Sequence, residues 1–191
     1  MKNFEAQLPA GYRAAFTIDA ADKKTGLRLN IVAGIIMAVM IAAAFLIIRP
    51  GSFFANTSPF HFIILGGSMV LYLVLHELTH GAAYKLLTGQ KLTYGFTSTV
   101  AYCGVPDIYV YRRASLIALL APFVVFTLVF GGLTLLLPRP IDQLFAAIAL
   151  AMHVGGCAGD LYDTGLYLLR FRDPRTLMRD TGPKQTFYLP E

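Results

Sequence analysis

Four long apolar segments constrain the fold of this chain more than any other feature. They lie at about 31–48, 60–87, 115–137 and 141–169. A helix needs about 20 mostly apolar residues to cross a bilayer, and each segment is close to or above that length. Only 14% of the residues are charged, against roughly 25% in a soluble domain. The pattern predicts an all-α membrane protein, with residues 1–191 forming a single integral membrane domain and with polar tails at 1–30 and 170–191.

The distribution of Lys and Arg predicts the orientation of these four helices. Fourteen of the 16 basic residues precede the first span, lie at the end of the second span or in the connection to the third, or follow the fourth. Only Arg49 and Arg139 lie in the other two connections. Because basic residues are retained on the cytoplasmic side, both termini and the middle connection are expected to be cytoplasmic, in a multi-pass protein of the cell membrane.

The net charge of +5 raises the question of a nucleic-acid partner. The basic residues cluster beside apolar spans and are not interleaved with aromatic residues as in a nucleic-acid groove. We therefore interpret them as topology signals and contacts with anionic lipid. The predicted partner is the lipid bilayer, and nucleic acid is excluded.

The segments outside the four spans predict only short regular elements. In the middle connection, residues 91–102 and 108–111 are rich in β-branched and aromatic types and flank a turn signal at 104–107. They predict a short β-hairpin, with an irregular loop as the alternative. Residues 16–29 predict a short interfacial helix with Asp19 or Asp22 as its N-cap. The proline-containing C-terminal tail is expected to be extended or poorly ordered.

The second apolar segment carries the sequence His-Glu-Leu-Thr-His at positions 76–80. On a helix, His76 and His80 lie one turn apart on one face, where both imidazoles can bind a single zinc ion. Glu77 lies between them and is free to act as a general base toward water at the metal. A charged residue at the centre of the bilayer costs roughly 2.5–3.5 kcal/mol or more, so a glutamate there indicates a function.

A zinc site of this kind needs a third protein ligand, and few residues qualify. The only glutamate after Glu77 is Glu191, at the end of the chain. Asp160 and Asp163 in the fourth segment lie at the predicted depth of the histidines, and Asp160 is the preferred ligand. The remaining candidates for an alternative ligand, or for a group supporting the ligands, are Asp163, His153 and Cys157. Ordinary packing or ion pairing is the alternative for each, and both Cys103 and Cys157 are expected to be reduced.

Three short stretches resemble a known family. They are His76–Gly81, Ala101–Cys103 leading to Ala121–Pro122, and Gly159–Leu161. The chain resembles the small bacterial membrane proteins grouped as zincin peptidases of unknown function. More remotely, it resembles the site-2 protease group of intramembrane metalloproteases, although Gly-Asp-Leu replaces the usual motif around the third ligand. The resemblance implies that His76, His80 and Asp160 bind Zn²⁺, that Glu77 is the base, and that the protein lies in a bacterial cytoplasmic membrane.

The leading functional hypothesis is an intramembrane zinc metallopeptidase that hydrolyses a peptide bond of a membrane protein or peptide, in or near the bilayer. A membrane metal transporter is one alternative, although such proteins usually have more spans and a second ligand-rich helix. A non-catalytic zinc-binding membrane scaffold is another. A di-iron fatty-acyl oxygenase fits poorly, because its site needs many histidines and this chain has four.

Overall fold

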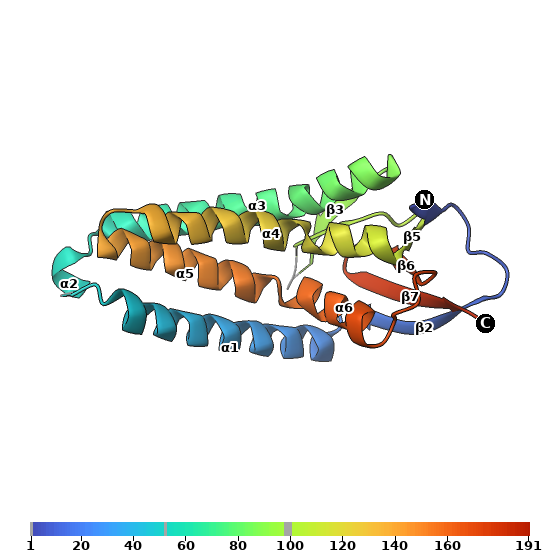
Figure 1. The fold of residues 1–191 in the computed structure, drawn as a ribbon, viewed down its shortest axis with the longest axis horizontal. Helices are drawn as coiled ribbons and strands as arrows, with labels where there is room; N and C mark the ends of the chain where they lie inside the picture. The colour runs from blue at the N-terminus through green and yellow to red at the C-terminus, as the bar shows by residue number, and fades with distance from the viewer. Residues whose placement is uncertain (1, 52, 98–100) are drawn as a thin grey trace. The chain divides into compact units, whose positions relative to one another are not determined.

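The computed structural model describes residues 2–51, 53–97 and 101–191, and helices dominate this part of the chain (Figure 1). The helices are α1 (Lys23–Ile48), α2 (Phe53–Asn56), α3 (Pro59–Thr88), α4 (Arg112–Leu136), α5 (Pro140–Gly156) and α6 (Ala158–Leu169). Within the described residues, α1, α3 and α4 are long and apolar enough to cross a membrane, and α5 with α6 makes a fourth candidate if that bent pair is one span. The helices agree with the four predicted segments and are consistent with a membrane protein.

The chain is not purely all-α, so that part of the predicted fold class is wrong. The strands are β1 (Phe4–Glu5), β2 (Tyr12–Asp19), β3 (Thr93–Phe96), β4 (Ala101–Gly104), β5 (Tyr109–Tyr111), β6 (Leu177–Asp180) and β7 (Lys184–Pro190). Five of them form an antiparallel sheet in the order β1-β5-β6-β7-β2, and β3 and β4 form a separate two-stranded sheet.

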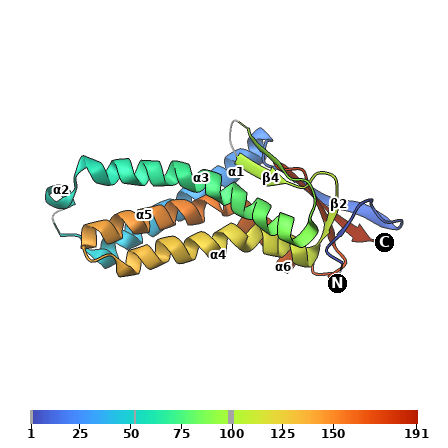
Figure 2. The ribbon, with the colours of Figure 1, turned by 90° about the horizontal axis from the view of Figure 1, so that it is seen from above.

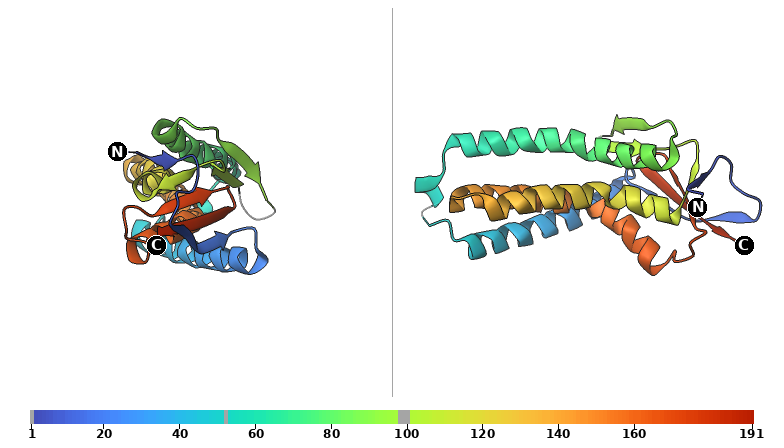
Figure 3. Two further views of the ribbon diagram at one scale, coloured as in Figure 1. Left: turned by 90° about the vertical axis from the view of Figure 1, so that its right-hand side faces the viewer. Right: turned by 45° about the horizontal axis from the view of Figure 1, so that its top comes forward.

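The pairing of β2 with β7 joins the two ends of the chain. It runs from Tyr12 opposite Pro190 to Asp19 opposite Lys184, with one irregularity between Ala14 and Phe16. Figure 3 shows the blue β2 beside the red β7. The C-terminal tail is therefore ordered, contrary to the sequence prediction, because partners distant in sequence satisfy its backbone hydrogen bonds.

The prediction of a short interfacial helix at 16–29 is also wrong. Residues up to Asp19 belong to β2, and α1 begins at Lys23 and continues as the first apolar helix. The expected cap is present, because the Asp22 carboxylate accepts a 3.0 Å hydrogen bond from the Thr25 backbone N–H.

A hairpin does connect the second and third apolar helices, but its strands pair differently from the prediction. β3 pairs with β4 from Thr93 opposite Gly104 to Phe96 opposite Ala101. Gly104 therefore lies in a strand and not in the turn. β5 was expected to be the second strand of the hairpin, and it joins the larger sheet between β1 and β6.

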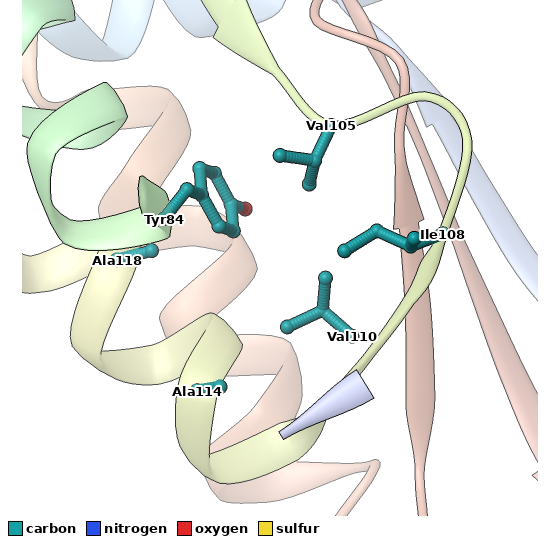
Figure 4. Close-up of a cluster of buried hydrophobic side chains, with 6 residues drawn as sticks. All are labelled: Tyr84, Val105, Ile108, Val110, Ala114 and Ala118. Atoms are coloured by element: carbon teal, nitrogen blue, oxygen red, sulfur yellow. The ribbon is translucent and has the colours of Figure 1, made fainter. Parts of the chain in front are cut away.

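The chain divides into two compact units. The first unit comprises residues 1–29, 75–122 and 159–191, and it holds both sheets together with the C-terminal part of α3. One of its cores packs α3 and α4 against the segment that leads into β5 (Figure 4). The residues of this core are Tyr84, Val105, Ile108, Val110, Ala114 and Ala118. A second core includes the stacked rings of Phe171 and Phe187, whose centroids are 4.8 Å apart.

The second unit comprises residues 30–74 and 123–158 and is helical in its described part. Its helical segments run lengthwise beside one another (Figure 2). One of its cores consists of Met69, Tyr72, Phe126, Phe130 and Ala149. All three residues of the His-Glu-x-x-His motif, as well as Asp160 and Asp163, belong to the first unit.

Candidate metal centre

The two histidines of the motif face each other on α3. His76 and His80 are 8% and 7% exposed, and their Nε2 atoms are 3.2 Å apart. One helical turn separates the two residues, so the helix alone brings the two rings together. Two imidazole nitrogens this close in a buried place require a proton or a cation between them.

Asp160, in the first turn of α6, completes the cluster. Its Oδ2 atom is 3.3 Å from His76 Nε2, and its Oδ1 atom is 3.4 Å from His80 Nε2. One donor atom from each of the three residues lies within 4.8 Å of the others, an arrangement that could hold a metal ion. Two residues on one helix and a third about 80 positions later thus converge on one point.

The backbone of α4 fixes the orientation of one imidazole. His80 Nδ1 is 2.8 Å from the carbonyl oxygen of Ala118. A carbonyl can only accept a hydrogen bond, so Nδ1 carries the proton and donates it. In the neutral ring, Nε2 then presents its lone pair to His76 and Asp160. A hydrogen bond from the distal ring nitrogen to a carbonyl is typical of histidines that bind metals.

The chemistry of the three donors fits zinc. Two imidazole nitrogens and one carboxylate oxygen are among the ligands that Zn²⁺ takes in proteins, and three protein ligands are characteristic of catalytic sites. Hard cations such as Mg²⁺ prefer an all-oxygen shell, which this cluster does not offer.

Glu77 lies beside the cluster and is only partly buried. It follows His76 by one position, so its side chain lies beside the face that His76 and His80 share. The carboxylate accepts a hydrogen bond from the backbone N–H of Cys103 in β4, and the charges of both histidines act on it. The structure therefore places a carboxylate between the part of α3 that carries His76 and His80 and the β3–β4 hairpin.

Comparison with known proteins bears on this cluster directly. The model of the family described as "Putative zincin peptidase" matches residues 69–173, which is more than half of the chain and includes His76, Glu77, His80 and Asp160. The chain belongs to this family. Membership assigns it to the metallopeptidases and implies zinc as the metal. No curated protein and no solved structure matches the chain.

Within this zincin peptidase, Asp163 is placed apart from the two histidines. It is 4% exposed, and its Oδ1 atom has no hydrogen-bond partner among the described residues. The charges of Asp160 and Asp180 act on it. Asp160, and not Asp163, is the carboxylate that lies against His76 and His80.

His153 and Cys157 belong to the second compact unit. His153 is fully buried, with Nδ1 2.9 Å from the Tyr72 hydroxyl and Nε2 3.2 Å from the carbonyl oxygen of Phe123. Because that carbonyl only accepts, Nε2 carries the proton and Nδ1 accepts from Tyr72. The Cys157 sulfur is 3.6 Å from His153 Nδ1, and Cys103 and Cys157, both described in the structure, form no disulfide.

Sequence reasoning missed two groups that support the cluster. The Ala118 carbonyl is a backbone group, so no residue type could have marked it. Asp180, in the tail, accepts a 2.7 Å hydrogen bond from Tyr84, which lies one turn beyond His80. Tyr84 follows His80 by four residues, so the sequence could have placed it on the helix face of His76 and His80. No local pattern indicated that Asp180 is its partner.

Proposed function

We propose that this zincin peptidase is an intramembrane metallopeptidase, with His76, His80 and Asp160 as the ligands of its zinc ion and Glu77 as its general base. The single observation that carries the proposal is the convergence of Asp160 on His76 and His80, at 3.3 and 3.4 Å, within an apolar helix of a zincin family member. The cell membrane and cytoplasmic termini remain part of the same proposal, supported by the distribution of basic residues.

When bound, zinc polarises a carbonyl group and lowers the pKa of water. The protein's own residues do the rest. His80 holds its Nε2 lone pair toward the cluster through its bond to Ala118. Glu77 accepts a proton from the attacking water and later donates one to the leaving amine, so that the water oxygen joins the carbonyl carbon as the C–N bond breaks.

An extended substrate fits the β3–β4 hairpin. A peptide must leave its helical conformation to be cut, and an extended chain can then pair with an open strand edge. The sheet has only two strands in the described part of the chain, and the Cys103 backbone N–H at one of them reaches Glu77. A peptide bound along this hairpin would lie beside the carboxylate that is proposed to act on it.

The decisive experiment compares the wild-type protein with Glu77→Gln in cells that lack the native gene. New N-termini of membrane proteins are labelled chemically and identified by mass spectrometry. The proposal predicts N-termini within or beside apolar spans that appear with wild type and are absent with Glu77→Gln, while both proteins retain bound zinc. Identical sets of N-termini would refute the peptidase, and zinc-dependent flux in proteoliposomes would then favour a transporter.

A further inference from the structure

The β3–β4 hairpin has two faces that contact different parts of the first unit. Tyr94 and Cys103 are directly opposite each other, so their side chains lie on the same face. The neighbouring pair is Gly95 opposite Tyr102, whose side chains lie on the other face. A displacement of the hairpin at one face can therefore change the contacts that its other residues make elsewhere in the unit.

The first face of the hairpin meets α3 at Gly81, the residue after His80. A Cβ atom at position 81 would overlap the Tyr94 hydroxyl, and it would lie 2.8 Å from Tyr94 Cζ and 3.1 Å from Leu92 Cδ1. Gly81 is buried and has helical geometry, so a larger residue would meet no backbone strain there but would force the Tyr94 ring, which is 45% exposed, to shift. The absent side chain at position 81 is what lets the Tyr94 ring pack against the motif helix.

Tyr94 is also linked to the base through Cys103. The Tyr94 hydroxyl and the Cys103 thiol are hydrogen-bonded, and the charge of Glu77 acts on both side chains. The backbone N–H of the same cysteine donates to the Glu77 carboxylate. One residue of β4 therefore contacts the hairpin tyrosine through its side chain and Glu77 through its main chain.

The second face of the hairpin packs on the C-terminal sheet. A Cβ atom at Gly182 would overlap the Tyr102 ring, and one at Gly104 would lie 2.5 Å from the Gly182 backbone nitrogen. The Val105 N–H donates a 2.9 Å hydrogen bond to the Asp180 carbonyl. This face is held by the C-terminal sheet, so a group added at position 81 would act on the opposite face, at the Tyr94 side chain.

We infer that Tyr94, packed on Gly81, is a positioning residue that sets the Glu77 carboxylate through Cys103. The inference rests on the proposed function only in giving Glu77 the role of the base. A methyl group at position 81 would displace Tyr94, move β4 and release the Glu77 contact. The metal ligands would keep their own contacts, since they bond to one another and to Ala118.

The test is Gly81→Ala, with Gly67→Ala as the matched control on the same helix. A Cβ atom at Gly67 meets nothing within 4 Å. Alanine favours a helix by about 1 kcal/mol over glycine, so neither change should destabilise α3 by itself. The first readout is the alkylation rate of Cys103, measured on its peptide by mass spectrometry, because Cys103 is 6% exposed and burial raises the pKa of its thiol to about 12.

We expect Gly81→Ala to raise the alkylation rate of Cys103 at least tenfold, and Gly67→Ala to leave it within twofold of wild type. Tyr94→Leu alone should raise the rate to a similar extent, and adding Gly81→Ala to it should change the rate less than twofold, because the methyl group acts through the tyrosine. An unchanged rate in Gly81→Ala, or a further rise when it is added to Tyr94→Leu, would overturn the packing contact. This readout needs no substrate, so it decides the contact even if the protein proves not to be a peptidase.

Absorption spectra of the cobalt-substituted protein and cleavage assays together test the positioning role. In Gly81→Ala, the Co²⁺ absorption bands should match those of wild type, while the formation of Glu77-dependent N-termini falls at least tenfold. Tyr94→Leu should lower cleavage to a similar extent with the cobalt bands unchanged, because it removes the contact with Cys103. Loss of the cobalt bands would overturn the inference, because the substitution would then have acted on the ligands. Unchanged cleavage with exposed Cys103 would also overturn it, and would leave the proposed function intact.

Discussion

The Tyr84 hydroxyl donates a 2.7 Å hydrogen bond to the Asp180 carboxylate, joining the helix that carries His76 and His80 to the last part of the chain. Tyr84 is 1% exposed and Asp180 is 3% exposed. Asp180 Oδ1 also accepts a 2.9 Å hydrogen bond from the Gly182 backbone N–H. The first unit therefore depends on a buried carboxylate that the tail supplies.

Tyr84→Phe should lower the free energy of unfolding of the protein in detergent by about 1–3 kcal/mol, because the substitution leaves a buried carboxylate without one of its donors. Tyr12→Phe is the matched control. Its hydroxyl donates to the Arg175 carbonyl in an exposed hydrogen bond, and we expect a change within about 0.5 kcal/mol. Denaturant titration measures both values, and equal losses for the two variants would contradict the prediction.

Truncation after Thr176 should prevent the first unit from folding. It removes β6 and β7, together with buried Leu177, Met178, Asp180 and Phe187. If the tail were instead disordered and dispensable, the full-length and shortened chains would bind zinc equally well. We expect the shortened chain to lose zinc binding and to be degraded in the membrane, which a blot and a metal analysis of purified membranes would reveal.

Asp160→Asn and Asp163→Asn should separate the two acidic residues of α6. If Asp160 is a ligand, its replacement should weaken zinc binding by more than the roughly 10–100-fold typical of a group that only supports a ligand. Asp163→Asn should keep the affinity within that range, because Asp163 does not reach the two histidines. Competition with a chromophoric chelator gives both constants, and a larger loss for Asp163→Asn would reverse the assignment.

Asp180 should make stability depend on pH. Burial raises the pKa of its carboxyl from 3.8 to about 6, although hydrogen bonds from Tyr84 and Gly182 oppose the rise. Between these two pKa values the folded protein binds more protons than the unfolded chain, so stability falls as pH rises from about 4 to about 6 and is then flat.

The corresponding loss is on the order of 2–3 kcal/mol for a shift of this size. Asp180→Asn removes the titrating group and keeps an oxygen that can accept from Tyr84. Unfolding curves at pH 4, 5, 6 and 7 should therefore show a fall in wild type that is absent, or clearly smaller, in Asp180→Asn. A parallel pH profile for the two proteins would show that Asp180 does not titrate in this range.

The sequence by itself determined the apolar helices and the motif on α3, since both depend on local patterns. Hydrophobicity over about 20 residues selects a helix wherever the bilayer excludes water from the backbone, whatever the rest of the chain does. The spacing of His76 and His80 places both rings on one face without any tertiary contact. The sequence was therefore sufficient to predict that His76 and His80 lie together on one helix.

Only the tertiary structure decided the rest. The sequence left Asp160 and Asp163 open as partners, because both lie on α6, and the packing of that helix selects which carboxylate meets the histidines. β2 and β7 likewise form by pairing across 169 positions at Thr17 and Thr186, which no local propensity could indicate. Strand pairing and side-chain convergence depend on distant partners, so Asp180 and Tyr94 acquire their roles only in the folded chain.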